Sequence, residues 1–160
     1  MDPITEKELN SYLSLEPFFA FSDKDSEVER QDFVDAYSVL PLTVKSIISG
    51  SATFQFLLAI GVEFQISKLK LEGLSKIIRD VLISRIYIGD MQNIIRDYLQ
   101  LDEVHAKTIS SKIVSDLFRP AMEDIKALQR QAFSARIGQP RPQINANQIN
   151  QNNIIDLKNK

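Results

Sequence analysis

The stretch that decides the fold runs from residue 69 to residue 136, and its first part, residues 69–118, reads LKLEGLSKIIRDVLISRIYIGDMQNIIRDYLQLDEVHAKTISSKIVSDLF. Apolar residues recur in it every three or four positions, which is the period of one face of an α-helix. The pattern predicts three helices in close succession and a fourth after Pro120, with apolar stripes at Leu71, Leu74, Ile78 and Val81, at Met91, Ile94, Ile95, Tyr98 and Leu99, at Ala106, Ile109, Ile113 and Leu117, and at Ala121, Ile125, Leu128 and Ala132.

Short polar residues, glycine and proline mark where these helices begin and end. Ser67, Asp90 and Asp102 each stand just before an apolar stripe, where a side-chain oxygen accepts a hydrogen bond from an exposed backbone N–H. Gly73 falls inside the first stripe and costs about 1 kcal/mol against alanine, which weakens the expectation of a straight helix. Pro120 either closes the third helix or opens the fourth, because proline lacks an N–H yet suits a first helical position.

A six-residue segment recurs with a spacing of 17 residues: residues 77–82 read IIRDVL and residues 94–99 read IIRDYL. We expect the charged residues at the solvent edge of their helices, because a buried charge needs a partner. The similarity is either chance between two amphipathic helices or a pair of matched polar contacts. In the second case the bundle is a small ligand-binding protein or enzyme that uses Arg79, Asp80, Arg96 and Asp97.

Four further helices are expected upstream. The first is a short helix with a capping box at Thr5-Glu6-Lys7-Glu8, continued by Leu9, Tyr12 and Leu13 and ended by Pro17. The others are one over residues 27–39, a short one that stops at Gly50, and one that Ser51 caps. The expected inward residues of these last three helices are, in order, Val28, Phe33 or Val34, and Tyr37, then Val44, Ile47 and Ile48, and then Phe54, Leu57, Leu58 and Val62.

Residues 39–62 raise the alternative of a membrane span, because Lys45 is their single charged residue and about 20 apolar residues suffice to cross a bilayer. Pro41, Gly50 and scattered polar residues argue against it, since lipid requires one continuous helix whose backbone groups satisfy each other. We therefore expect two short buried helices and no membrane span.

Composition excludes several chemistries. The chain has 160 residues, 44% hydrophobic and 25% charged, which suits one globular domain with a tail. It has no cysteine, so disulfides, zinc–thiolate sites and cysteine nucleophiles are excluded. The only histidine, His105, lacks neighbouring ligands and is expected at the surface, and no catalytic residue, metal or cofactor is predicted. The acidic, polar N-terminus lacks the features of a secretory signal, which favours the cytoplasm.

Nucleic-acid binding is an alternative that the charge balance disfavours. The net charge is −2, which gives no basic footprint. Residues 91–118 imitate a helix-turn-helix, but Asp102 and Glu103 would stand at the start of its second helix and repel phosphate. This alternative requires one basic face formed by Lys107, Lys112, Arg119, Lys126 and Arg130.

The last 22 residues differ from the rest in composition. Residues 139–160 hold six Asn and four Gln and no aromatic residue, so they cannot bury enough apolar surface to fold, and we predict a disordered tail after a helical domain at residues 1–138. An apolar cluster nonetheless stands near the end, at Ile154, Ile155, Asp156 and Leu157. It is either a frayed terminus or a short motif that binds a groove or sheet edge of a partner protein.

The segment from Leu40 to Arg130 resembles a helical module of uncharacterised bacterial proteins. The resemblance rests on Leu40-Pro41, Ser51-Ala52-Thr53 and Phe118-Arg119-Pro120, together with a terminal Ile155-Asp156-Leu157 on a polar tail. It implies an all-helical domain of unknown role, and it transfers no catalytic residues.

The sequence therefore predicts an all-α fold, a compact bundle of six to eight short antiparallel helices with a disordered C-terminal tail. The function that it favours is a non-enzymatic interaction or adaptor module. The folded part would bind one protein, and the cluster at residues 154–157 would bind another or a second copy of the chain.

Overall fold

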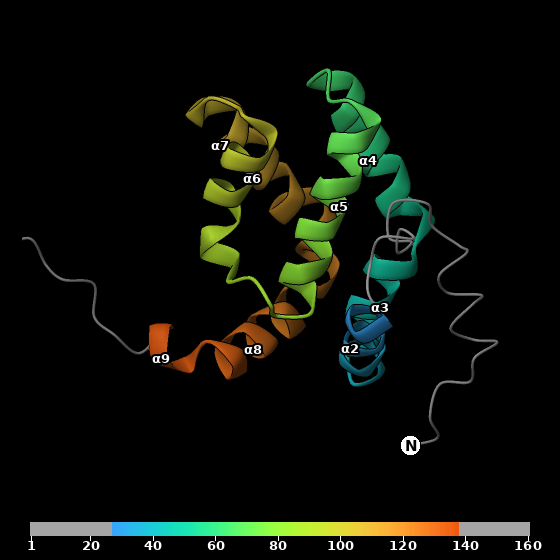
Figure 1. Ribbon diagram of the computed structural model, residues 1–160. Coiled ribbons are helices and arrows are strands. Elements are labelled where there is room, and N and C mark those ends of the chain that lie inside the picture. The colour runs from blue at the N-terminus through green and yellow to red at the C-terminus, as the bar shows by residue number, and fades with distance from the viewer. Residues whose placement is uncertain (1–26, 138–160) are drawn as a thin grey trace, which may run out of the picture.

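The computed structural model describes residues 27–137, and within that range every regular element is helical (Figure 1). The α-helices are α2 (Glu27–Ser38), α3 (Leu42–Ser49), α4 (Ser51–Glu63), α5 (Lys68–Leu82), α6 (Met91–Leu99), α7 (Glu103–Lys112), α8 (Met122–Ala132) and α9 (Ser134–Ile137). Three links are also helical: η1 (Ile88–Asp90) and η3 (Arg119–Ala121) are 3₁₀-helices, and η2 (Ile113–Phe118) is a π-helix. The predicted all-α fold of short helices is confirmed.

The four helices from α4 to α7 lie side by side in the order of the sequence, whereas α3 leads directly into α4 with a bend of 51°. Helices α4, α5, α6 and α7 run alternately up and down in Figure 1, and each contacts the next. Helix α8 crosses the end of this row and contacts α3, where Thr43 Oγ1 donates to Asp124 Oδ2 at 2.5 Å. Short loops favour this arrangement, because they leave a helix no room to pack anywhere but beside its predecessor.

One apolar core holds these helices together. Its largest fully buried side chains come from every long helix of the described range: Phe33, Ile48, Leu57, Leu74, Ile78, Leu82, Met91, Ile95, Ile109, Ile113, Phe118 and Ile125. The predicted stripes of α5 and of α7 with η2 therefore face inward, and so do Val44, Ile47 and Ile48 of α3. On α6, Met91, Ile95 and Leu99 are buried, but Tyr98, which was predicted to share their face, is 45% exposed. On α8, the predicted inward residue Ala132 is exposed.

Helix α5 continues through Gly73 without a break. It begins where predicted, at Ser67, whose hydroxyl accepts from the Lys70 N–H at 3.4 Å. A Cβ on Gly73 would collide with the ring and hydroxyl of Tyr98 on α6. The glycine thus allows the aromatic ring to lie directly on the α5 backbone, and this close packing accounts for a residue that weakens the helix locally.

Pro120 is accommodated by two changes of helical pitch. Its ring would clash with the carbonyl of residue 116 in a regular α-helix, and it donates no hydrogen bond. The chain widens into the π-helix η2 before it and then tightens into the 3₁₀-helix η3, which contains it. Helix α8 begins two residues later at Met122, so Pro120 belongs to the link between the third and fourth predicted helices.

Several predicted details are wrong. Val28 and Val62 were expected inward, yet they are 68% and 82% exposed, and Leu58 is 39% exposed. Asp90 does not cap α6 with its side chain, because its carboxylate binds Arg136 instead. Ser51 is the first residue of α4 and the cap position is Gly50.

No single helix within residues 27–137 is long and apolar enough to cross a membrane. Helices α3 and α4 pass that test of length and composition only as a pair, and they are bent by 51° at the break between them.

Candidate functional site

Helix α4 has apolar residues on every side, and only one side of it enters the core. The inward side consists of Thr53, Leu57, Ile60 and Gly61. Thr53 Oγ1 donates to the Ile47 carbonyl at 2.5 Å, which closes the turn between α3 and α4. A Cβ on Gly61 would lie 2.6 Å from a methyl carbon of Leu71, so α4 and α5 approach closely there.

The opposite side of α4 is exposed and carries no charge before its last residue, Glu63, which pairs with Lys112. It consists of Ala52, Gln55, Leu58, Ala59 and Val62, which are spaced so that they share one helix face. All five are exposed, and no charged residue occurs between Lys45 and Glu63. A surface helix normally presents charged groups to water, so an uncharged apolar outer face indicates a contact surface. We call these five residues the α4 outer face.

Two more exposed apolar residues lie at the end of the bundle where α4 finishes. Leu69 and Val104 are 73% and 72% exposed and occupy the first turns of α5 and α7. The links α4–α5 and α6–α7 meet at this end, where the Phe64 ring meets the His105 ring edge-on at 6.0 Å. Val62 therefore stands at the edge of a bundle end that also exposes apolar side chains.

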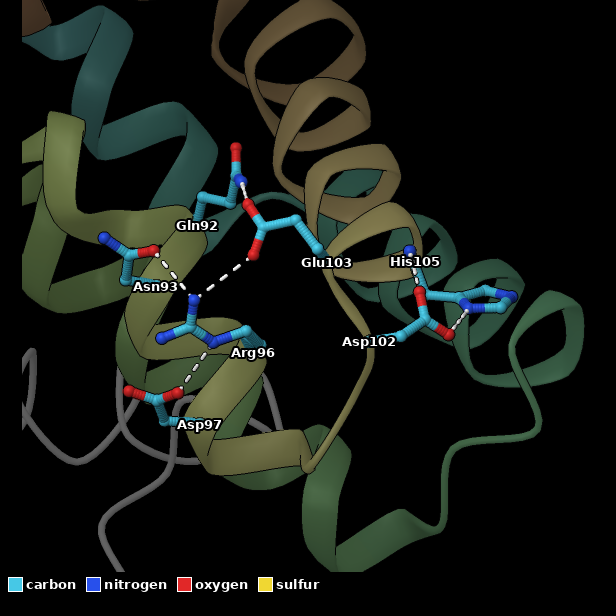
Figure 2. Close-up of polar contacts among 7 residues, drawn as sticks. All are labelled: Gln92, Asn93, Arg96, Asp97, Asp102, Glu103 and His105. Carbon is cyan, nitrogen blue, oxygen red and sulfur yellow. Dashed lines mark hydrogen bonds and ion pairs between the residues drawn. The ribbon is translucent and has the colours of Figure 1, made fainter.

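A polar network fixes the turn between α6 and α7 (Figure 2). Arg96 Nε donates to Asp97 at 2.9 Å, and its Nη1 donates to Glu103 at 3.2 Å. Gln92 donates to the other oxygen of Glu103. The Asp97 hydrogen bond is the largest cause that raises the pKa of Arg96. The network holds the start of α7 against α6, and its members are mostly exposed.

His105 belongs to a helix cap. Asp102 Oδ1 accepts a hydrogen bond from the His105 backbone N–H at 2.9 Å, which is the predicted helix cap. Asp102 Oδ2 lies 2.5 Å from Nδ1 of the His105 ring and hydrogen-bonds with it. These hydrogen bonds, the backbone one foremost, lower the pKa of Asp102. The imidazole is exposed, which confirms the predicted surface histidine. No group of three metal-ligand residues gathers anywhere between residues 27 and 137.

The two Arg-Asp pairs adopt the same internal contact in different surroundings. Arg79 Nε lies 3.2 Å from Asp80 Oδ1, as Arg96 Nε does to Asp97. Arg79 is only 7% exposed and its guanidinium lies 5.4 Å from the centre of the Phe33 ring. Its predicted place at the solvent edge is wrong, because stacking on an aromatic ring and a carboxylate partner compensate for its burial.

The structure does not join these pairs into one polar cluster. Within the described range, the Asp80 carboxylate pairs with Arg79 and the Asp80 carbonyl accepts from Arg85 and Ile86. Arg96 instead donates to Asn93 and Glu103. The geometry thus gives two local contacts and supports the chance similarity of two amphipathic helices.

Gln129 is a buried polar residue that the sequence patterns did not single out. Its side chain, on α8, is 2% exposed and accepts the Ile88 N–H at 2.9 Å. Its amide nitrogen donates to the carbonyls of Val81 and Ile86, at 2.9 and 3.0 Å. One amide therefore satisfies three backbone groups, one in the last turn of α5 and two in the link between α5 and α6.

A second contact fixes the place where the chain leaves the described range. Arg136 on α9 binds both carboxylate oxygens of Asp90, at 2.6 and 3.0 Å, and lies 4.7 Å from the centre of the Tyr87 ring. The Phe133 ring meets Tyr87 at 5.4 Å. The Arg136 hydrogen bond lowers the pKa of Asp90. The last described turn is thus held at the end of the bundle where α6 begins.

The sequence-predicted partner-binding residues Ile154, Ile155, Asp156 and Leu157 lie outside the described residues, as do the whole predicted tail and the predicted first helix that begins at Thr5. The nucleic-acid alternative requires one basic face that includes Lys112 and Lys126. In the structure Lys112 forms an ion pair with Glu63, and Lys126 forms one with Glu123.

Comparison with protein-family models, with curated proteins and with solved structures finds no match, so the resemblance to a bacterial helical module stays a prediction.

Proposed function

We propose that this chain is a non-enzymatic protein-interaction module with two contact elements. One is the α4 outer face, and the other is the segment Ile154–Leu157. The exposed, uncharged face of α4 is the single observation that carries the proposal. The cytoplasm remains the predicted location.

The α4 outer face suits a protein surface because its side chains are apolar or neutral over about three helical turns. A helix of 13 residues is about 20 Å long, long enough to present two rows of side chains to a partner groove. Leu58 and Val62 supply the apolar contacts, and Ala52 and Ala59 allow the partner to approach the backbone closely.

The test is capture of proteins from native lysate by the full chain and by matched variants. Ala59→Lys/Val62→Lys places two charges on the α4 outer face, and Val39→Lys/Leu42→Lys places two charges on exposed apolar positions at the α2–α3 turn. Both pairs lie at exposed positions, where substitutions change stability by roughly 0.5 kcal/mol or less. We expect the first variant to lose a partner that the wild-type chain and the second variant keep.

The segment Ile154–Leu157 is tested in the same way. Ile154→Asn/Ile155→Asn/Leu157→Asn removes its apolar side chains, and Ile144→Asn/Ile149→Asn changes the same residue type elsewhere in the tail. A second partner should be lost only with the first of these variants. Capture profiles that are identical for all four variants would show that neither element binds a protein.

A further inference from the structure

Helices α8 and α9 together form an arm that crosses the end of the bundle (Figure 1). We call residues 122–137 the C-terminal arm. Only two side chains of α8 are buried, Ile125 and Gln129, whereas α5 buries eight. One of the two is polar, so hydrogen bonds carry a large part of the attachment. Segments that bury few apolar side chains are the ones that open locally from a folded protein.

The C-terminal arm contacts one segment of the bundle through three of its side chains. That segment is the α5–α6 link at residues 83–90. Gln129 hydrogen-bonds to the backbone of this link and of the adjoining end of α5. Arg136 binds both carboxylate oxygens of Asp90, and the Tyr87 ring meets both Arg136 and Phe133. Separation of the arm from the link would break all of these contacts together.

The backbone between α7 and the C-terminal arm is not a continuous α-helix. The chain passes through the π-helix η2 and the 3₁₀-helix η3 before α8 begins, and Pro120 donates no backbone hydrogen bond. An α-helix is cooperative because each residue extends the hydrogen-bond ladder of the preceding turn. The changes of pitch interrupt that ladder, so α8 can move away from the bundle without unwinding α7. Residues 113–121 therefore provide a hinge.

The α5–α6 link is itself held in a strained conformation. Ser84 has a φ of 58°, in the left-handed region that residues other than glycine rarely adopt. Its hydroxyl oxygen is buried and has no hydrogen-bond partner among the residues that the structure describes. Strained residues and unpaired buried polar atoms persist only where the surrounding structure holds them in place. The contacts of the C-terminal arm are part of what holds this link.

We infer that the C-terminal arm is a lid over the α5–α6 link, and that it opens as one unit about residues 113–121 while helices α3 to α7 stay folded. Opening exposes the Tyr87 ring and the backbone groups that Gln129 satisfies, and it lets Ser84 relax. It also withdraws Ile125 from the core, which keeps the closed state dominant. Gln129 and Arg136 hold the lid closed and so set how often the link is accessible. The inference goes beyond the proposed function and does not depend on the α4 outer face.

Native-state hydrogen exchange of the purified full-length chain, followed by NMR in low urea, tests this. The reporters are the Leu128 amide on α8 and the Ile88 amide, whose acceptor is the Gln129 side chain. Both should exchange through one opening, with the same opening constant and the same urea dependence. We expect that constant to exceed the constant of the Ile78 amide on α5 by about tenfold or more, with less than about half of its urea slope, because only the lid and the link become exposed.

Two arginine substitutions on the C-terminal arm test what holds the lid closed. Arg136→Gln removes the contacts with Asp90 and Tyr87, and it should raise the opening constant at Leu128 and Ile88 by roughly two- to fivefold. Arg130→Gln removes the same charge from an exposed position of α8 and should leave both amides unchanged. Equal effects of the two variants would overturn the role given to Arg136.

A third variant separates lid opening from unfolding of the whole bundle. Ile60 is buried on α4, and Ile60→Val should raise the opening constant of the Ile78 amide by roughly two- to tenfold. The Leu128 and Ile88 amides should not respond, because α4 stays packed when only the lid opens.

Two results would overturn the inference. If the Leu128 and Ile88 amides accelerate in Ile60→Val by the same factor as the Ile78 amide, the C-terminal arm opens only when the whole bundle unfolds. If protection instead falls gradually along α8 while the Ile88 amide stays as protected as the Ile78 amide, the end of the helix frays and no lid opens as a unit.

Discussion

Replacement of Gln129 by leucine should destabilise the fold more than any other single polar substitution on α8. Leucine keeps most of the volume of the side chain but leaves the Ile88 N–H and the Val81 and Ile86 carbonyls without their amide partner. Three hydrogen bonds at about 1 kcal/mol each set the scale. Ile86 and Ile88 are partly exposed, and the Val81 carbonyl keeps a hydrogen bond from Ser84, so we expect a loss of about 2–3 kcal/mol.

The loss is measured by urea unfolding followed by far-UV circular dichroism. With a slope of about 2 kcal/mol per molar urea, the midpoint should fall by about 1–1.5 M. Gln131→Leu, at an exposed position of the same helix, is the control and should leave the midpoint unchanged. Hydrogen exchange at the Ile88 amide should accelerate in Gln129→Leu, because that N–H loses its acceptor. A midpoint within about 0.2 M of the wild type would refute the assignment of Gln129 as the residue that fixes this loop.

Two further predictions concern close packing and acid stability. Gly73→Ala should stabilise the chain by about 1 kcal/mol in a Tyr98→Ala background, where helix propensity acts alone. In the wild-type background the gain should be smaller by at least about 0.5 kcal/mol, because the new methyl displaces the Tyr98 ring. The two substitutions and their combination are compared by urea unfolding. Effects on the free energy of unfolding that simply add would contradict this prediction. The pKa of Asp90 is lowered in the folded state, so its contribution to stability is present above the unfolded pKa and is lost as the pH falls through the folded pKa. Asp90→Asn should therefore lower the free energy of unfolding by at most about 1 kcal/mol at pH 7. It should also reduce the amount of that free energy that is lost between pH 7 and pH 3. If the pH dependence were unchanged, Arg136 would not stabilise the folded carboxylate.

The fold could be predicted from local patterns to a large extent. The helices over residues 68–82, 91–99 and 103–118 follow from strong 3.6-residue periodicity, and Ser67 and Asp102 cap them as short polar residues at such positions do. The prediction failed at Asp90, which has an alternative partner in Arg136, 46 residues away. Sequence spacing cannot reveal a partner at that separation.

The α4 outer face illustrates a different limit. Where apolar residues occur on all sides of a helix, periodicity does not select the buried side, and so Val62 was assigned inward. The sequence shows that residues 46–62 carry no charge, which by itself predicts buried helices. Because one side of α4 is exposed to solvent in the structure, the same lack of charge indicates a contact surface there. Arg79 was misplaced for a related reason, since its aromatic neighbour Phe33 belongs to another helix.

The sequence by itself determined the fold class, the positions of most helices and the exclusion of cysteine chemistry, because these depend on the order and identity of nearby residues. Only the tertiary structure decided which side of α4 meets solvent, how Arg79 is buried and which loop Gln129 holds. Each of these depends on groups that are distant in the chain and adjacent in space, and their contacts form only when the helices pack.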